Sequence, residues 1–297
     1  MVEKHISNFI SYLSFQKRAS PLTVKSYQLD LIQFFNFLES EIKLTSLNQI
    51  THQHARGFIA HLMDKGISAR SVNRKLSSLK SFFNYLLKQN SVASNPITKV
   101  QGPKAIKNLP VFVDEKQTEY LFEKYIFEDT FIGKRNKLII DIFYQTGVRR
   151  AELLNIKESD VDIYNSQIKV LGKRNKERII PFDISLKRNL EAYIFVKKEL
   201  KLKNPYLLVS QKDTQLNAQA ITKIVNEVLS AVTTSKNKSP HVLRHTFATH
   251  LLNNGANINA VKELLGHASL QATQIYTHNT IEKLKKQYNQ AHPRSGD

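Results

Sequence analysis

A basic, proline-containing stretch divides the chain into two helical patterns, and this division constrains the fold more than any other feature. The stretch runs from Gly102-Pro103 to Pro110. Proline lacks the amide hydrogen that a helix needs and glycine favours turns, so neither helical pattern continues through it. With 297 residues the chain is long enough for two hydrophobic cores. We therefore predict two domains and a linker, with bounds 1–103 for the first domain, 104–109 for the linker and 110–297 for the second domain.

The first domain is predicted to be all helical. Helix-start signals stand at Ser20-Pro21, Thr51 and Ser68, where a hydroxyl can cap the first turn. They predict about four helices, the last two over 51–64 and 68–89 in a tight hairpin.

The helix predicted over 68–89 has two unlike faces. Its apolar side chains fall on one face, and the opposite face carries Arg70, Arg74, Ser77 and Ser81. Two interpretations stay open for this polar face: an ordinary solvated surface, or a surface whose arginines reach DNA phosphates and bases. The helix over 21–40 repeats the theme less clearly near its start, with Thr23, Lys25, Tyr27 and Gln28.

The second domain is predicted to combine helices with a small β-hairpin. Helices are expected from Asp114, over 135–146, after Gly147, and over most of the chain beyond 184. Two strand-like runs, 167–171 and 178–181, flank a basic turn. The predicted fold class is mainly α with a small antiparallel β-sheet.

The charge distribution points to a polyanionic partner. The chain has 44 Lys and Arg residues against 25 Asp and Glu residues, a formal charge of +19. Both domains share the excess, +8 in residues 1–103 and +11 in the rest. This predicts a nucleic acid clamped by both domains.

The sequence lacks the signals of a membrane or secreted protein. No apolar run is long enough for a transmembrane span, and the N-terminus is unlike a signal peptide. Cysteine is absent. We therefore expect a cytoplasmic protein without a membrane partner, disulfides or thiolate metal sites.

Histidine and arginine gather at one predicted helix start. His241, Arg244 and His245 follow Pro240 at spacings that place them in neighbouring positions of the first turn. Because a helix N-terminus already favours anions, cations there suggest an external anion in front of them. A zinc site on His241 and His245, with His250 or His267 as third ligand, is the competing interpretation, but the pair lacks the adjacent glutamate of a hydrolytic zinc motif.

The motifs of the second domain resemble those of tyrosine recombinases of the Xer type, site-specific recombinases of the phage integrase family that resolve bacterial chromosome dimers at cell division. The resemblance rests on Thr-Gly-Val-Arg-Arg-Ala-Glu-Leu over 146–153, the Gly-Lys hairpin over 172–178, Pro-His-Val-Leu-Arg-His over 240–245, and Leu-Gly-His with Tyr-Thr-His over 265–278. It covers the whole chain and implies a C-shaped two-domain DNA clamp.

Cleavage of a phosphodiester without a metal ion requires that the negative charge of the pentavalent transition state be neutralised. Two guanidiniums that fork the non-bridging oxygens, those of Arg149 and Arg244, are suited to this. The resemblance implies that Tyr276 is the nucleophile, forming a 3′-phosphotyrosyl link, and that Lys173 is the general acid. It also implies that His241 assists proton transfer and that His267 hydrogen-bonds a phosphate oxygen. Neither metal, ATP nor any other cofactor is expected.

Four positions near these motifs have expected roles of their own. Glu152 is expected to orient the site from behind Arg149, with an ordinary surface salt bridge as the rival interpretation. Arg174 replaces a glycine that is common in relatives, so Arg174 and Lys176 are candidate DNA contacts. Arg150, beside Arg149, is expected to be solvated or to face a phosphate.

The resemblance also implies a tetramer on double-stranded DNA, in which a helix near 280–290 docks on a neighbouring subunit. It leaves open whether the four subunits are identical or include a paralogous recombinase, and whether a DNA translocase activates them. Three alternatives stay open: integration of a phage or mobile element, a DNA-binding accessory protein without catalysis, and a relaxing enzyme of the type IB topoisomerase kind.

Overall fold

The structure, a computed structural model, divides into two compact units, residues 1–108 and 109–297. It describes residues 2–44, 46–104, 112–172, 176–266, 288 and 290–293. Each unit has its own hydrophobic core, and each is described by itself.

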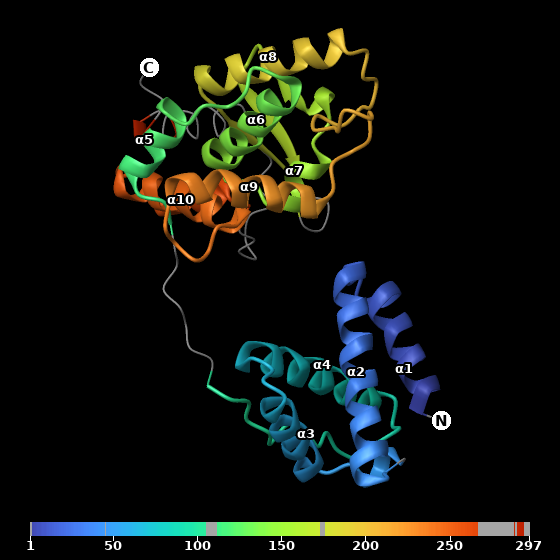
Figure 1. The fold of residues 1–297 in the computed structure, drawn as a ribbon. Coiled ribbons are helices and arrows are strands. Elements are labelled where there is room, and N and C mark those ends of the chain that lie inside the picture. The colour runs from blue at the N-terminus through green and yellow to red at the C-terminus, as the bar shows by residue number, and fades with distance from the viewer. Residues whose placement is uncertain are drawn as a thin grey trace. The chain divides into compact units, whose positions relative to one another are not determined.

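The first unit is all helical in its described residues (Figure 1). Two helix starts have the predicted caps, because the Ser20 and Ser68 hydroxyls accept the backbone N–H of Thr23 and Ser71. The four predicted helices are thus confirmed. Their bounds are α1, Val2–Ser11, continued by the π-helical turn η1, Tyr12–Gln16; α2, Pro21–Ile42; α3, His52–Asp64; and α4, Ala69–Lys88, with the short 3₁₀ helix η2, Leu47–Gln49, between α2 and α3.

Aromatic side chains form the centre of the first core. Phe9 of α1, Phe34 of α2 and Phe82 of α4 are fully buried, and the Phe9 and Phe82 rings meet edge to face with centroids 5.4 Å apart, an arrangement that adds to the stabilisation from burial. The predicted apolar face of α4 is buried throughout, at Val72, Leu76, Leu79, Phe83 and Leu86.

The second unit contains seven described helices and a three-stranded sheet. In the described residues, helices form at the predicted places, although the one predicted over 135–146 begins earlier, at Phe131, where Thr130 caps it. The helix bounds are α5, Glu115–Glu123; α6, Phe131–Thr146; α7, Arg150–Asn155; α8, Ile184–Glu199; α9, Ala218–Val232; α10, Pro240–Asn253; and α11, Ile258–Leu264, with the 3₁₀ helix η3, Glu158–Asp160.

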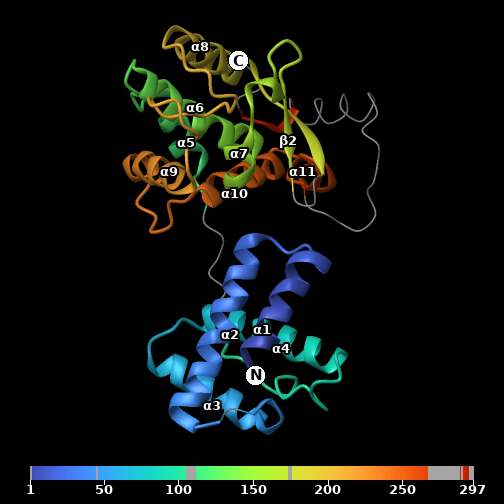
Figure 2. The ribbon, with the colours of Figure 1, turned by 90° about the vertical axis from the view of Figure 1, so that its right-hand side faces the viewer.

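Helix α6 is the centre of this unit. From Leu138 to Thr146 every residue is buried, which is typical of a helix surrounded by others rather than of a surface helix. It lies between α8 on one side and α9 and α10 on the other (Figures 1 and 2). No helix in the described part of the chain is both long and apolar enough to cross a membrane.

The predicted hairpin is confirmed, with one additional strand. The strands β2, Gln167–Leu171, and β3, Glu177–Pro181, pair antiparallel with Lys169 opposite Ile179. A two-residue strand β1, Val161–Asp162, joins the other edge of β2. It was not predicted because two residues carry no alternating pattern. The predicted fold class, mainly α with a small antiparallel sheet, is therefore confirmed.

The helix predicted near 280–290 lies mostly outside the described residues. Of its C-terminal end, Tyr288 is described, and both Tyr288 and Ala291 are buried in the core of this chain's own second unit. The Tyr288 hydroxyl donates to Gln145 of α6 at 3.3 Å, and Asn254 donates to the Ala291 carbonyl at 3.1 Å.

Candidate active site

Arg149 is placed by the junction of α6 and α7. Helix α6 ends at Gly147 in the left-handed conformation (φ 58°), and α7 begins at Arg150 with Arg149 as its N-cap residue. The backbone N–H of Arg149 donates to Glu152 Oε2 at 2.7 Å, and its guanidinium Nη1 donates to Glu152 Oε1 at 2.8 Å. One carboxylate therefore fixes both the backbone and the side chain of Arg149.

Glu152 also binds a second arginine. Arg178 of β3 donates to both carboxylate oxygens, at 3.0 Å to Oε1 and 2.8 Å to Oε2, in the forked geometry that makes such pairs strong. Burial by itself raises the pKa of Glu152, but the hydrogen bonds and charge of Arg178 and the hydrogen bonds from Arg149 outweigh it, so the pKa is lowered. Glu152 is only 6% exposed, and the rival interpretation of an ordinary surface salt bridge is wrong for that reason.

Arg178 is not among the site residues predicted from the sequence. Its guanidinium is buried, and Nε donates to the Leu264 carbonyl at 2.8 Å. A signal was present in the strand pattern: Arg178 and Ile180 are two positions apart, so they share the inward face of β3. A charged residue at an inward strand position needs a buried partner, and Glu152 is that partner.

Arg244 approaches from α10. This helix begins at Pro240, as predicted, so Arg244 lies in its first turns. Its guanidinium donates from Nη1 to the Gly147 carbonyl and from Nη2 to the Leu265 carbonyl, the latter at 2.8 Å. Burial, followed by repulsion from Arg149 and Arg178 that Glu152 partly offsets, lowers the pKa of Arg244 to about 10.

Three arginines thus meet three successive carbonyls at the end of α11. Arg178 binds the carbonyl of Leu264, Arg244 that of Leu265, and Arg149 that of Gly266, at 3.3 Å. This arginine cluster (Arg149, Arg178 and Arg244) has one carboxylate, that of Glu152, within it. Three cations against one anion leave positive charge without a counter-ion among the described residues, a composition that suits a bound anion.

Four of the predicted site residues lie outside the described residues: Lys173, Arg174, His267 and Tyr276. Two described glycines that directly precede such residues lie next to the arginine cluster. Gly172, which precedes Lys173, and Gly266, which precedes His267, each lie so close to Arg178 that an added Cβ would be 3.3 Å and 3.1 Å from its Nη1.

The predicted histidines occupy unlike surroundings. His241 is exposed at the start of α10, and His245, half-buried, contacts Phe112 edge to face. His250, considered above as a third zinc ligand, is instead buried, with Nδ1 3.2 Å from the Tyr144 hydroxyl oxygen. Desolvation by burial lowers the pKa of His250.

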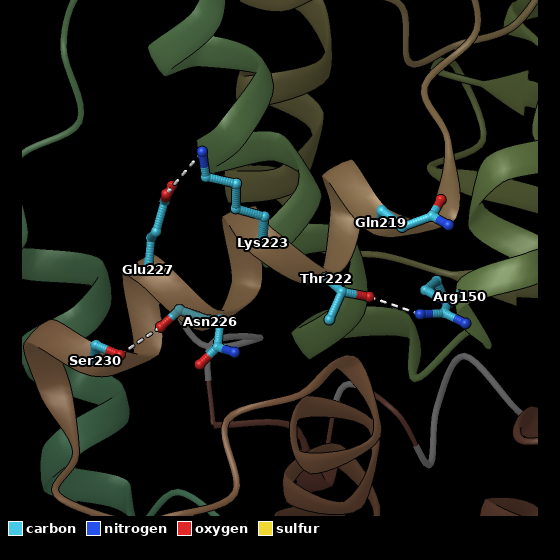
Figure 3. A pocket seen from close by; sticks show the side chains of 7 residues that line it. All are labelled: Arg150, Gln219, Thr222, Lys223, Asn226, Glu227 and Ser230. Atoms are coloured by element: carbon cyan, nitrogen blue, oxygen red, sulfur yellow. Dashed lines mark hydrogen bonds and ion pairs between the residues drawn. The ribbon is translucent and has the colours of Figure 1, made fainter.

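Arg150 points away from the arginine cluster. It is exposed and donates to the Thr222 hydroxyl of α9 at 2.6 Å. Figure 3 shows it at one end of a groove of about 760 Å³ along α9, together with Gln219, Thr222, Lys223, Asn226, Glu227 and Ser230. Of the two adjacent arginines, Arg149 is therefore the one in the cluster. Lys176, after the hairpin tip, is exposed.

The candidate DNA contacts of the first unit are not equally accessible. Lys25, Arg70 and Ser77 are exposed, and so is Thr23, whose hydroxyl is 2.8 Å from that of Ser20 in the helix cap. The Tyr27 ring is half-buried against the core and stacks on Phe9 with centroids 6.4 Å apart, so its ring serves packing. Arg74 is exposed on one side but is bound to Asp30 on the other.

Two family models match this chain, one in each unit. The model of the phage integrase family matches residues 112–283, and that of the phage integrase N-terminal SAM-like domain matches residues 6–90. The chain therefore belongs to the phage integrase family, and the resemblance stated from its motifs is confirmed.

Relatives that match nearly the whole of this chain are recombinases. "Tyrosine recombinase XerC" of Staphylococcus saprophyticus is 39% identical over 295 residues, 99% of each chain. The protein of the same name from Chlorobaculum parvum is 34% identical over 96% of this chain and 93% of its own. Among solved structures, the XerH site-specific recombinase in a post-cleavage complex with palindromic difH substrate has a TM-score of 0.73 at 26% identity, covering 91% of this chain and 80% of that one. The protein is thus a tyrosine recombinase, an enzyme that breaks and rejoins DNA.

Proposed function

We propose that this protein recombines duplex DNA at a specific site through a 3′-phosphotyrosyl intermediate, and that it resolves chromosome dimers at cell division. The observation that supports this most directly is the arginine cluster, in which three guanidiniums share one carboxylate. A phosphodiester is the anion that such a cluster would neutralise in a protein of this family.

In the proposed reaction Arg149 and Arg244 hold the scissile phosphate. A guanidinium has five N–H donors, and each of these two uses part of its set on carbonyl or carboxylate oxygens that fix its plane. The remaining donors bind the non-bridging oxygens, whose negative charge grows in the transition state. Because the arginines are held beforehand, no reorganisation is needed when that charge develops.

Each step of the proposed reaction forms one bond to phosphorus and breaks another, so no external energy source is needed. The Tyr276 oxygen attacks phosphorus and loses its proton, with assistance from His241, while the bond to the 5′ oxygen breaks and that oxygen takes a proton from Lys173. His267 hydrogen-bonds a phosphate oxygen. Rejoining reverses these steps with a new 5′ hydroxyl, so the phosphodiester energy is conserved. Glu152 acts through Arg149 and Arg178, which it binds.

We propose that both domains, with bounds near 1–103 and 110–297, contact the DNA. In the first domain Thr23, Lys25, Tyr27, Arg70, Arg74 and Ser77 are the candidate contacts, and in the second Arg174 and Lys176. Four subunits, identical or with a paralogous recombinase, exchange strands between two sites through a Holliday junction in the cytoplasm, and a DNA translocase is a candidate activator. The full-length match to XerC relatives supports a role on the chromosome.

Covalent trapping tests the proposal. A suicide duplex with the host's candidate recombination site is incubated with the protein in chelator and without ATP, and the products are separated on a denaturing gel. Wild type should form a protein–DNA adduct and Tyr276→Phe should form none. Tyr164→Phe is the matched control, since the Tyr164 side chain is 91% exposed in the loop after β1, and it should trap like wild type.

The remaining outcomes separate the alternatives. DNA binding without an adduct, even with a paralogous partner added, would support an accessory binding protein and overturn the catalytic proposal. Relaxation of a supercoiled plasmid that lacks any recombination site would favour the type IB topoisomerase kind of activity.

A further inference from the structure

A buried carboxylate in the first unit gathers two cations from a neighbouring helix. Asp30 of α2 is 1% exposed. It accepts hydrogen bonds from three side chains of α4: Arg74 Nη1, Lys75 Nζ at 2.9 Å and Ser78 Oγ at 2.8 Å. A buried carboxylate needs such partners because burial alone would disfavour its charge.

The two cations differ in how they reach solvent. The Lys75 side chain is 13% exposed, whereas the Arg74 side chain is 47% exposed. Arg74 binds Asp30 through Nη1 alone, and its Nε and Nη2 have no hydrogen-bond partner among the described residues. Since one carboxylate cannot neutralise two cations, the positive charge that remains is presented to solvent mainly by Arg74.

Arg74 also lies on the same face of α4 as two other exposed polar residues. Arg70 and Ser77, one turn before and one turn after it on α4, are exposed. A guanidinium held at one nitrogen over this surface loses little side-chain freedom when it meets a phosphate, because its orientation is fixed beforehand.

We propose that Asp30 is a positioning residue for DNA binding: it holds the Arg74 guanidinium so that its free N–H donors meet a backbone phosphate. This inference rests on the proposed function, in which the first domain contacts DNA. Asp30 itself does not touch the DNA.

Two rival roles for Asp30 would give different binding results. If Asp30 affected DNA binding only through net charge, removal of its carboxylate would make the protein more positive and tighten DNA binding. If Asp30 only joined α2 to α4, its loss would weaken binding by the same factor whether or not Arg74 is present. Positioning requires weaker binding, and only while Arg74 is present.

The experiment measures the dissociation constant of the full chain for a fluorescent duplex at several salt concentrations. The variants are Asp30→Asn, Arg74→Ala, the double variant, and Glu41→Gln, which removes one negative charge from an exposed position of the same helix. Thermal unfolding of each variant is recorded in parallel.

Asp30→Asn should bind about fivefold more weakly than wild type, an effect of the size expected for one weakened arginine contact. Arg74→Ala should bind at least as weakly, and the double variant should bind like Arg74→Ala alone. Glu41→Gln should bind as tightly as wild type or slightly more tightly. The salt dependence of Asp30→Asn should be less steep than that of wild type, toward the slope of Arg74→Ala.

Equal or tighter binding by Asp30→Asn, with Arg74→Ala weakened, would overturn the inference and leave the proposed function intact. An equal loss in both backgrounds would assign Asp30 a structural role only. If neither wild type nor any variant binds DNA, the proposed function itself fails. If Asp30→Asn does not fold, Ser78→Ala provides the test, because it removes one hydrogen bond to Asp30 without a change in charge. Ser78→Ala should bind DNA about twofold more weakly than wild type, and only while Arg74 is present. Unchanged binding by Ser78→Ala would refute the inference.

Discussion

At the scale of single residues, the candidate active site depends on one buried carboxylate. Glu152 binds Arg149 and Arg178, and these two with Arg244 bind the three carbonyls that end α11. Without Glu152, the buried cation Arg178 would keep only the Leu264 carbonyl as a partner within the described part of the chain. The carboxylate therefore determines both the orientation of Arg149 and the stability of the hairpin that carries Arg178.

Replacing Glu152 with Gln should lower the free energy of unfolding of the second unit by about 3–5 kcal/mol at neutral pH, because it leaves the buried Arg178 charge unpaired. The pKa of Glu152 is lowered on folding from an ordinary value of 4.5. Its stabilisation is thus complete above that value and is lost as the pH falls through the lower folded-state pKa. The difference between wild type and variant should shrink below about pH 4.5.

Urea unfolding between pH 7 and pH 3 measures this difference. Glu227→Gln is the control, since the Glu227 carboxylate is 60% exposed and pairs with Lys223 on the surface of α9, a pair expected to contribute less than about 0.5 kcal/mol. A Glu152→Gln deficit that does not change with pH would contradict the assigned charge pairing.

At the scale of elements, the site is built from helix ends rather than from helix faces. The end of α6 supplies the Gly147 carbonyl, the start of α7 supplies Arg149, the first turns of α10 supply Arg244, and the end of α11 supplies three carbonyls. Helix ends have unpaired backbone groups, and here arginines satisfy several of them.

Gly147 is the residue at which two of these ends meet. Its φ of 58° favours glycine, and an added Cβ would lie 2.4 Å from Phe247 Cδ1 of α10. Gly147→Ala should therefore cost both a conformational penalty of about 1 kcal/mol and a packing penalty of about 1–3 kcal/mol. It should also lower adduct formation, because the shift that the added Cβ requires would displace the backbone carbonyl at position 147, which accepts from Arg244.

Gly255→Ala separates the two penalties. Gly255 has a φ of 84° in the same unit, but an added Cβ meets nothing within 4 Å. Its replacement should cost only the conformational penalty and leave adduct formation unchanged. If both alanine variants unfold at the same denaturant concentration, the close contact with Phe247 does not lower the free energy of unfolding.

At the scale of the whole molecule, the chain has two separately packed units that are both strongly basic. Residues 1–103 have a formal charge of +8 and the remainder +11. A protein that contacts DNA phosphates with both units releases counter-ions from both contacts. The salt dependence of binding should therefore report how many units take part.

The affinity of the full chain for duplex DNA should fall by about 10³-fold or more between 50 and 200 mM salt, as expected for six or more phosphate contacts. Because the units have separate cores, residues 1–104 and 112–297 can be prepared separately, and each should show a less steep salt dependence than the full chain. Fluorescence anisotropy at five salt concentrations measures the slopes. If one unit alone reproduces the full slope, the other does not contact the phosphates.

The sequence by itself determined the local features of this protein. Cap residues such as Ser20 and Ser68 predicted where helices begin, and Pro240 predicted the start of α10 and so the place of Arg244. Two strand-like runs on either side of a basic turn predicted β2 and β3. These features depend on neighbours within a few residues, which a pattern contains. The family motifs predicted Arg149 and Glu152 together because both lie in one capping turn.

The tertiary structure alone decided which buried charges pair. Glu152 meets Arg178 and Asp30 meets Arg74 across 26 and 44 positions of the chain, and Tyr27 packs on Phe9 although it lies among polar neighbours. Such contacts depend on which helix ends and strand faces pack together, and no local pattern contains that information. A buried charge must find a partner, but only the packing of the core determines which residue that partner is.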